Sequence, residues 1–140
     1  MSDSKVRDRI FVEEKTMEIY KSLNASATRN SSVYDQPFSE SKEIFMWAVA
    51  VGVCDGRKQP LFGNKEGLFF WNRLSPEQEL PILRLIVISE TRDIEMIKDD
   101  AYIQNLTEEY ANYGIRKLND ILIKQGGSPL FNLVDLVRKQ

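Results

Sequence analysis

Apolar residues recur at helical spacing along much of this chain, beginning near its N-terminus. Ile10, Met17, Tyr20 and Leu23 are separated by charged residues. Spacing of this kind is typical of an amphipathic helix, and it predicts one over residues 5–23. The polar stretch that follows, rich in Ser, Asn and Thr, predicts a solvated and mobile loop over residues 24–37.

The segment from Ile44 to Val53 is apolar on nearly all sides, and Gly56 follows it. A segment of this length and composition predicts a helix buried at the centre of the fold and ended by the glycine. A strand is the lesser alternative, because three of its residues are β-branched valines.

The second half of the chain predicts three further helices. Ser75-Pro76, with Gln78 three residues after the serine, is typical of a helix start, and residues 82–91 are apolar enough for a second central helix, although Pro81 is expected to set the first turn apart. Apolar residues from Asp93 onward keep to one helical face up to Gly126-Gly127, which predicts a long helix loosened at Gly114. Ser128-Pro129 begins a short closing helix.

These elements predict a mainly α fold: one compact domain over residues 1–140, with about five helices and a flexible N-terminus over residues 1–4. With 140 residues and 42% apolar content, the chain can bury one continuous core without disulfides. Between residues 57 and 72, glycines and a proline divide the chain into short extended pieces, which we expect to pair as a small hairpin-like insertion.

Charge and residue usage restrict the chemistry. The chain has no histidine, which removes the commonest general base near neutral pH and the commonest zinc ligand. The formal net charge is −2, so any contact with DNA must come from a local patch. The charged N-terminus does not fit a signal peptide, and no segment approaches the length of apolar residues that spans a membrane. We therefore expect a cytoplasmic protein, in which the single cysteine, Cys54, is a small buried hydrophobe.

The segment CDGRKQPLFGNKEGLFFWNRLSP, residues 54–76, has the most unusual composition. Its glycines allow close backbone approach to a phosphate, the side chains of Arg57, Lys58, Lys65 and Arg73 supply positive charge, and Trp71 anchors the loop or offers a stacking surface. The alternative is that the glycines shape turns, the cations are solvated and the aromatic residues cover the core. The pattern leaves both interpretations open.

Acidic residues are the remaining candidates for chemistry. A magnesium-dependent nuclease would need several carboxylates around one ion. Their spacing favours ordinary helix positions: Asp99 and Asp100 at a helix start, Glu108 and Glu109 on the polar side of a long helix, and Glu13 on the first helix. The other members of the set are Asp93 and Glu95. We predict no catalytic residue, no metal and no cofactor.

Five segments in order, FMWAVAVGVCDGRKQPL, KEGLFFWN, LPILRLIVISETRDIEMIKDD, EEYANYGI and GGSPLFNLVDLV, resemble the Dnd system-associated, or DNA phosphorothioation-associated, protein four family over about residues 5–139. The resemblance implies a setting in bacterial antiviral defence, DNA phosphorothioation and restriction-modification, with DNA or a protein of the defence complex as partner. It supplies no catalytic residues. The segment EEYANYGI departs from the family pattern, in which two glycines are expected.

Together these observations predict a non-enzymatic accessory protein that binds DNA or a defence-complex subunit, with self-association left open. The predicted contacts are Arg57, Lys58, Lys65 and Arg73, with Trp71 as the anchor of the loop. A stand-alone DNA-binding transcriptional regulator and a metal-dependent nuclease subunit are the alternatives.

Overall fold

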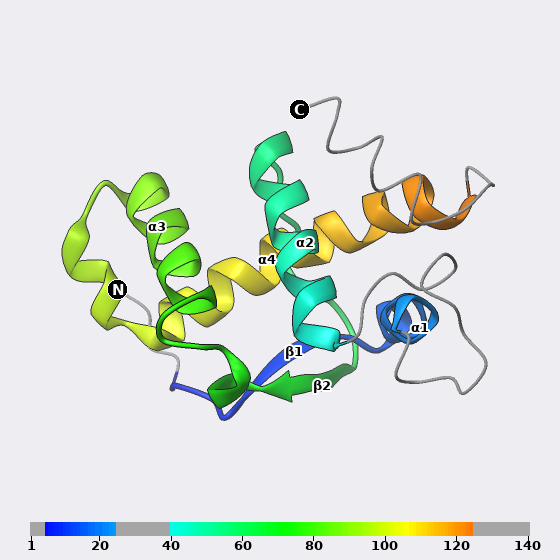
Figure 1. Cartoon of the computed structure of the whole chain (residues 1–140), viewed down its shortest axis with the longest axis horizontal. Helices are drawn as coiled ribbons and strands as arrows, with labels where there is room; N and C mark the ends of the chain where they lie inside the picture. Colours follow the sequence, from blue (N-terminus) through cyan, green and yellow to red (C-terminus); the bar gives the residue numbers. More distant parts are fainter. Residues whose placement is uncertain (1–4, 25–39, 125–140) are drawn as a thin grey trace.

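The computed structural model describes residues 5–24 and 40–124, and a long helix, α4 (Asp100–Asn119), runs through the middle of the molecule (Figure 1). Helix α2 (Ser41–Asp55) crosses α4, and these two elements contact each other more extensively than any other pair. Helices α1 (Glu14–Leu23) and α3 (Glu79–Thr91) also contact α4, on either side of α2 (Figure 1). Three short helical turns complete the described part: η2 (Trp71–Arg73), η3 (Ile94–Lys98) and the π-helical η4 (Asp120–Lys124).

The predicted fold class is confirmed, because the chain is mainly helical with one small antiparallel pair of strands, β1 (Arg9–Glu13) and β2 (Lys65–Phe70). The origin of the strands differs from the prediction. The segment before Trp71 does not pair with itself; β2 pairs with β1, from Arg9 opposite Phe70 to Glu13 opposite Lys65. The strand pair therefore joins segments more than fifty residues apart.

The prediction of one helix over residues 5–23 is wrong in its first half. Ile10 and Val12 alternate on one side of β1 and are buried, which is the two-residue period of a strand. The helical spacing of Met17, Tyr20 and Leu23 is real, since all three are buried on one face of α1. A short strand followed at once by a helix leaves an apolar spacing that resembles one longer helix.

The crossing of α2 over α4 depends on two glycines. A Cβ atom built on Gly114 of α4 would lie 1.8 Å from the carbonyl oxygen of Ala48, and one on Gly52 of α2 would lie 2.5 Å from that of Tyr110. Gly114 therefore permits the close approach of two helix backbones. The prediction that Gly114 loosens the long helix is wrong. Helix α2 is the buried central helix that was expected, and it ends at Gly56 in the left-handed conformation with φ of 67°.

Helix α3 differs from its prediction in two ways. It begins at Glu79 and not at Ser75; the Glu79 carboxylate accepts a 2.7 Å hydrogen bond from the backbone N–H of Ser75. Pro81 then falls in the first turn, where a backbone N–H would have no partner within the helix. The helix is also not central, because only Leu83 and Val87 are buried.

The long helix predicted from Asp93 is divided into η3 and α4. Asp93 accepts a hydrogen bond from the N–H of Glu95, and Asp99 accepts one of 3.0 Å from the N–H of Tyr102, so each aspartate caps the start of one helical segment. The predicted flexible N-terminus over residues 1–4, the loop predicted over residues 24–37 except Asn24, and the closing helix after Gly127 lie outside the described residues.

Candidate functional site

The four cations predicted to bind an anion do not share one surface. Arg57 and Lys58 follow the C-terminal end of α2, whereas Lys65 begins β2 and Arg73 ends η2, beyond the other end of that strand. Six strand residues span about 20 Å, so Lys65 and Arg73 lie far apart. A continuous track for a phosphate backbone is not formed by these four residues.

Two of the four are engaged in ion pairs. Lys58 Nζ lies 3.0 Å from Glu90 Oε2 of α3, and the same ammonium sits 5.8 Å from the centroid of the Tyr110 ring. The guanidinium of Arg73 lies 2.5 Å from Glu40 Oε1. Within the described residues, Arg57 and Lys65 are exposed and form no ion pair. These two remain the available cations of the predicted set.

Trp71 lies in η2, partly buried against the hydrophobic core. Its backbone N–H donates a 2.8 Å hydrogen bond to the carbonyl of Asp8. The neighbouring Phe69 packs edge-on against Phe45 of α2, with ring centroids 5.4 Å apart. The aromatic end of the unusual segment therefore fastens β2 to the core.

A buried carboxylate holds the first half of that segment in place. The side chain of Glu13, the last residue of β1, is 2% exposed and accepts hydrogen bonds from the N–H of Phe62, from Asn112 Nδ2 and from Arg116, at 2.9, 2.9 and 2.7 Å. Burial alone would raise the pKa of Glu13, but these hydrogen bonds hold it below its ordinary value. The prediction that Glu13 lies on a helix is wrong, and its carboxylate has a structural role.

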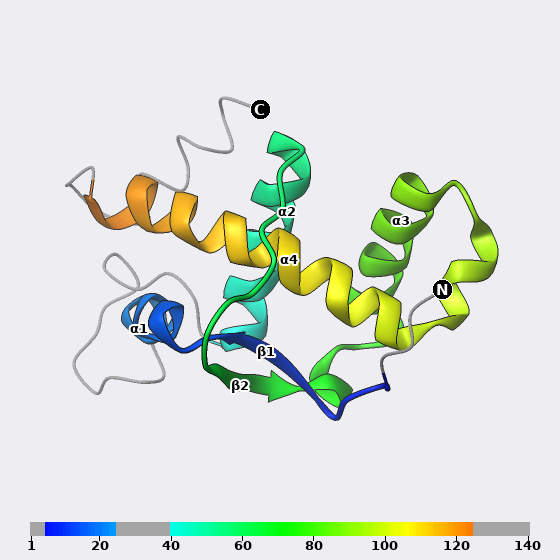
Figure 2. The ribbon, with the colours of Figure 1, turned by 180° about the vertical axis from the view of Figure 1, so that it is seen from behind.

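Backbone contacts add to this attachment. The segment between α2 and β2 passes over α4 on the side away from α2 (Figure 2). The N–H of Gln59 donates to the carbonyl of Glu109 at 3.0 Å, and Asn112 Nδ2 lies 3.1 Å from the carbonyls of Gln59 and Pro60. The chain from residue 57 to residue 65, named here the α4-crossing loop, is therefore pinned to α4 at several points.

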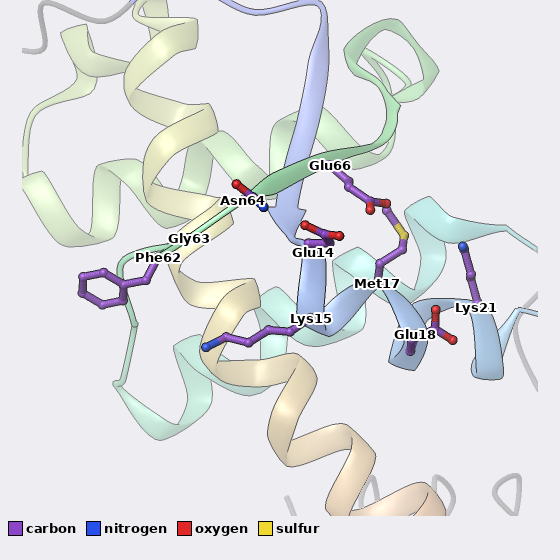
Figure 3. Close-up of a pocket in the computed structure, with 9 residues that line it drawn as sticks. All are labelled: Glu14, Lys15, Met17, Glu18, Lys21, Phe62, Gly63, Asn64 and Glu66. Carbon is purple, nitrogen blue, oxygen red and sulfur yellow. The ribbon is translucent and has the colours of Figure 1, made fainter.

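The large hydrophobic side chain that this loop exposes is Phe62, which is 69% exposed. Its backbone N–H is bound by Glu13, while its ring lies beside a hollow of about 660 Å³ between the loop and α1. In Figure 3 the Phe62 ring points away from the carboxylates of Glu14 and Glu66. The hollow is lined by Glu14, Lys15, Met17, Glu18, Lys21, Phe62, Gly63, Asn64 and Glu66.

The sequence did not single out Phe62. Phe62 follows Pro60 and Leu61 and precedes Gly63. No local pattern distinguishes an aromatic side chain at an exposed loop position from one that folds back onto the core. The relevant signal is long-range: Glu13 and Asn112 fix the loop from elements on either side of it in the sequence.

A second buried carboxylate, Glu108 of α4, ties down the N-terminal segment. It accepts hydrogen bonds from Arg7 and from the N–H of Phe11, at 2.8 and 2.7 Å. Burial raises its pKa above the ordinary value, although Arg7 opposes that shift. The prediction that Glu108 lies on the polar side of α4 is wrong. Gln104, Glu108 and Asn112 recur every four residues and are buried, and Arg116 continues the row at its half-exposed end. This repeat is the sequence signal of a largely buried polar row.

The remaining candidates for chemistry are the single cysteine and the acidic residues. Cys54 is exposed, so its prediction as a buried hydrophobe is wrong. Over residues 5–24 and 40–124, no group of three or more Cys, Asp or Glu side chains is arranged to hold a metal ion. Within these residues, no helix has the length and apolar character needed to cross a bilayer.

Comparison with known proteins identifies one family. The sequence model of the family described as DNA sulphur modification system-associated protein 4 matches residues 9–139, nearly the whole chain. The resemblance inferred from the five ordered segments is thereby confirmed. No curated protein and no solved structure matches the chain.

Proposed function

Because this chain belongs to the DNA sulphur modification system-associated protein 4 family, we propose that it is a cytoplasmic, non-enzymatic accessory protein of a DNA sulphur modification system, and that it acts by docking onto another protein of that system. The linked restriction and antiviral defence functions are the setting in which such docking has a purpose. The α4-crossing loop is the docking element in this proposal.

The observation that carries the proposal is the presentation of Phe62. The Phe62 ring is 69% exposed, and the backbone that carries it is held by the Glu13 carboxylate and by Asn112. An aromatic side chain on a pre-organised backbone loses little conformational freedom on binding, which is typical of residues that dominate protein interfaces.

Charge around the loop favours a protein partner over the DNA backbone. Arg57 at one end and Lys65 at the other are unpaired within the described part, while Lys58 is neutralised by Glu90. Two separated cations beside an aromatic ring suit an apolar protein surface with acidic residues at its rim. Duplex DNA, in contrast, is held by many adjacent cations, and the chain as a whole carries a formal net charge of −2.

The proposal of a non-enzymatic protein is supported by the structural roles of its buried and capping carboxylates. Glu13 and Glu108 are engaged in internal hydrogen bonds, and Asp99 caps α4. The buried and capping carboxylates hold segments together and are not directed at a bound molecule. The carboxylates that line the hollow beside Phe62 are Glu14, Glu18 and Glu66. Among the described residues, these three are not grouped so as to hold a metal ion.

The proposal is tested by co-expressing the tagged full chain with the proteins of the sulphur modification system from the same host. We expect one of them to co-purify in a fixed ratio, and the purified chain alone to leave plain and sulphur-modified duplexes unshifted in a gel. Alanine at Arg57, Lys58 and Lys65 together should weaken the protein complex, because the two end cations are lost.

Three outcomes would contradict the proposal. A duplex shift that weakens steeply with salt and disappears in the triple variant would identify a DNA-binding protein. Magnesium-dependent nicking of plasmid, abolished by removal of one carboxylate, would identify a nuclease. Failure of every protein of the system to co-purify would remove the accessory role.

A further inference from the structure

Helix α3 is more apolar than its position in the fold requires. Its sequence, ELPILRLIVISET, is apolar on most sides, yet the helix lies at the edge of the molecule and buries only Leu83 and Val87. On the outer side, Ile82 is 50% exposed and Leu85 is 65% exposed. A peripheral helix of a monomer usually carries polar residues on its outer side.

The exposed face borders a groove. Helices α2 and α3 stand apart from each other above α4 (Figure 1), and between them lies a hollow of about 450 Å³. Its walls are formed by Val53 of α2 and by Ile82, Leu85 and Ile86 of α3. The carboxylate of Glu90, which also lines the groove, is satisfied by Lys58 and by the Tyr110 hydroxyl, so no uncompensated charge opposes an apolar occupant.

Within α3, the exposed residues Ile82, Leu85 and Ser89 are spaced by three and four and share one side of the helix, with Glu90 exposed beside them. Leu85 is the central residue of this 13-residue helix. A helix with such a face is suited to pairing with an identical helix across a two-fold axis.

The charges at the ends of the face decide the direction of pairing. Glu77 lies just before α3 and Arg92 just after it; both are exposed, and neither forms an ion pair within the described part. Parallel pairing of two copies would bring like charges together. Antiparallel pairing brings each Arg92 to the Glu77 end of the other copy and opposes the two helix dipoles, which is favourable.

We propose that the chain pairs with a second copy of itself through α3, with the two helices antiparallel and Leu85 on the two-fold axis. The groove between α2 and α3 of each copy receives the apolar side of the other copy's α3. The contact is isologous, so one surface serves both partners. The pairing surface does not include Phe62, although Lys58 of the α4-crossing loop reaches the groove by pairing with Glu90.

Analytical ultracentrifugation of the full chain over a wide concentration range tests the pairing. We expect a reversible monomer–dimer equilibrium, and we expect Leu85→Glu to raise the dissociation constant at least about thirtyfold, because a central apolar contact becomes a buried charge. Leu85 is exposed in the monomer, so circular dichroism should show an intact fold. Glu18→Gln, an exposed change on α1, is the control and should leave the equilibrium unchanged.

Charge reversal tests the direction. Glu77→Arg or Arg92→Glu alone should weaken the dimer about three- to tenfold, and the two together should restore it, because the opposite charges meet again. If these residues serve only the dipole of their own helix, the double variant would instead show the weakest dimer, and the antiparallel arrangement would be refuted.

A cross-link tests the axis. With Cys54→Ser in place, Leu85→Cys should oxidise to a disulfide-linked dimer. A wild-type chain that sediments as a monomer up to about 1 mM, a dimer that tolerates Leu85→Glu, or protection of position 85 by residues 125–140 of the same chain would each overturn the proposal. A monomeric result would leave the accessory function itself unaffected.

Discussion

Replacement of Gly114 by alanine distinguishes two accounts of the α2–α4 crossing. If this glycine only loosened α4, alanine would stabilise the helix by about 1 kcal/mol through its better helix propensity. The structure predicts the reverse. The added methyl group would lie 1.8 Å from the carbonyl oxygen of Ala48 and 2.6 Å from its carbonyl carbon, far inside van der Waals contact.

The size of the loss in stability depends on which atoms the added methyl group would clash with. Overpacking a core costs about 1–3 kcal/mol when side chains can adjust. Here the obstacle is the backbone of α2, which cannot rotate away, so the upper part of that range applies and the propensity gain is exceeded. We expect a net loss of about 2 kcal/mol, or about 6 °C in Tm for a chain of this size.

Urea unfolding followed by circular dichroism measures this change. Gly52→Ala, whose Cβ would lie 2.5 Å from the carbonyl oxygen of Tyr110, should also destabilise the fold. Glu18→Gln, an exposed change on α1, is the control and should leave the midpoint nearly unchanged. A Gly114→Ala protein that unfolds at the same or a higher urea concentration than wild type would refute the close backbone packing.

Three further predictions concern single side chains. The buried Tyr20 hydroxyl has no hydrogen-bond partner among the described residues, so Tyr20→Phe should leave the free energy of unfolding unchanged or raise it by up to about 1 kcal/mol, measured in urea. Because burial raises the pKa of Glu108 above 4.5, its contribution to stability is full below that pH and is lost as the pH rises through the folded value. Glu108→Gln should therefore gain stability relative to wild type as unfolding is repeated at increasing pH above 4.5, and a pH-independent difference would contradict the shift. Exposed Cys54 should react with a thiol reagent almost as fast in the native protein as in urea, and strong protection in the native state would contradict its placement.

Local patterns were sufficient for the central helix and for several boundaries. The apolar run of α2 predicted burial, Gly56 predicted its end, and Asp99 was recognised at a helix start. Each of these features depends on a few neighbouring residues, which is why the sequence alone was adequate.

The features that were missed depend on contacts between distant segments. Strand β1 is a strand because β2, more than fifty residues later, supplies its hydrogen bonds. Glu108 is buried because Arg7 and Phe11 cover it. The apolar composition of α3 predicted a central helix, whereas the fold leaves α3 at the edge with only Leu83 and Val87 buried.

The contact residues proposed from the sequence are placed differently from one another by the fold. Lys58 and Arg73 are engaged with Glu90 and Glu40, and the most exposed large hydrophobic side chain of the segment is Phe62. The charge of a cation can be read directly from the sequence. The exposure of an aromatic ring depends on how the loop packs against α4 and can be determined only from the structure.

Titration calorimetry between the purified chain and the co-purifying protein of the sulphur modification system tests the central claim most directly. Phe62→Ser should weaken binding at least about tenfold, while Phe70→Ser, a change at another exposed aromatic residue of 48% exposure, should leave the affinity within about threefold of wild type. Equal affinity of the Phe62→Ser and wild-type chains would show that docking does not occur through the α4-crossing loop.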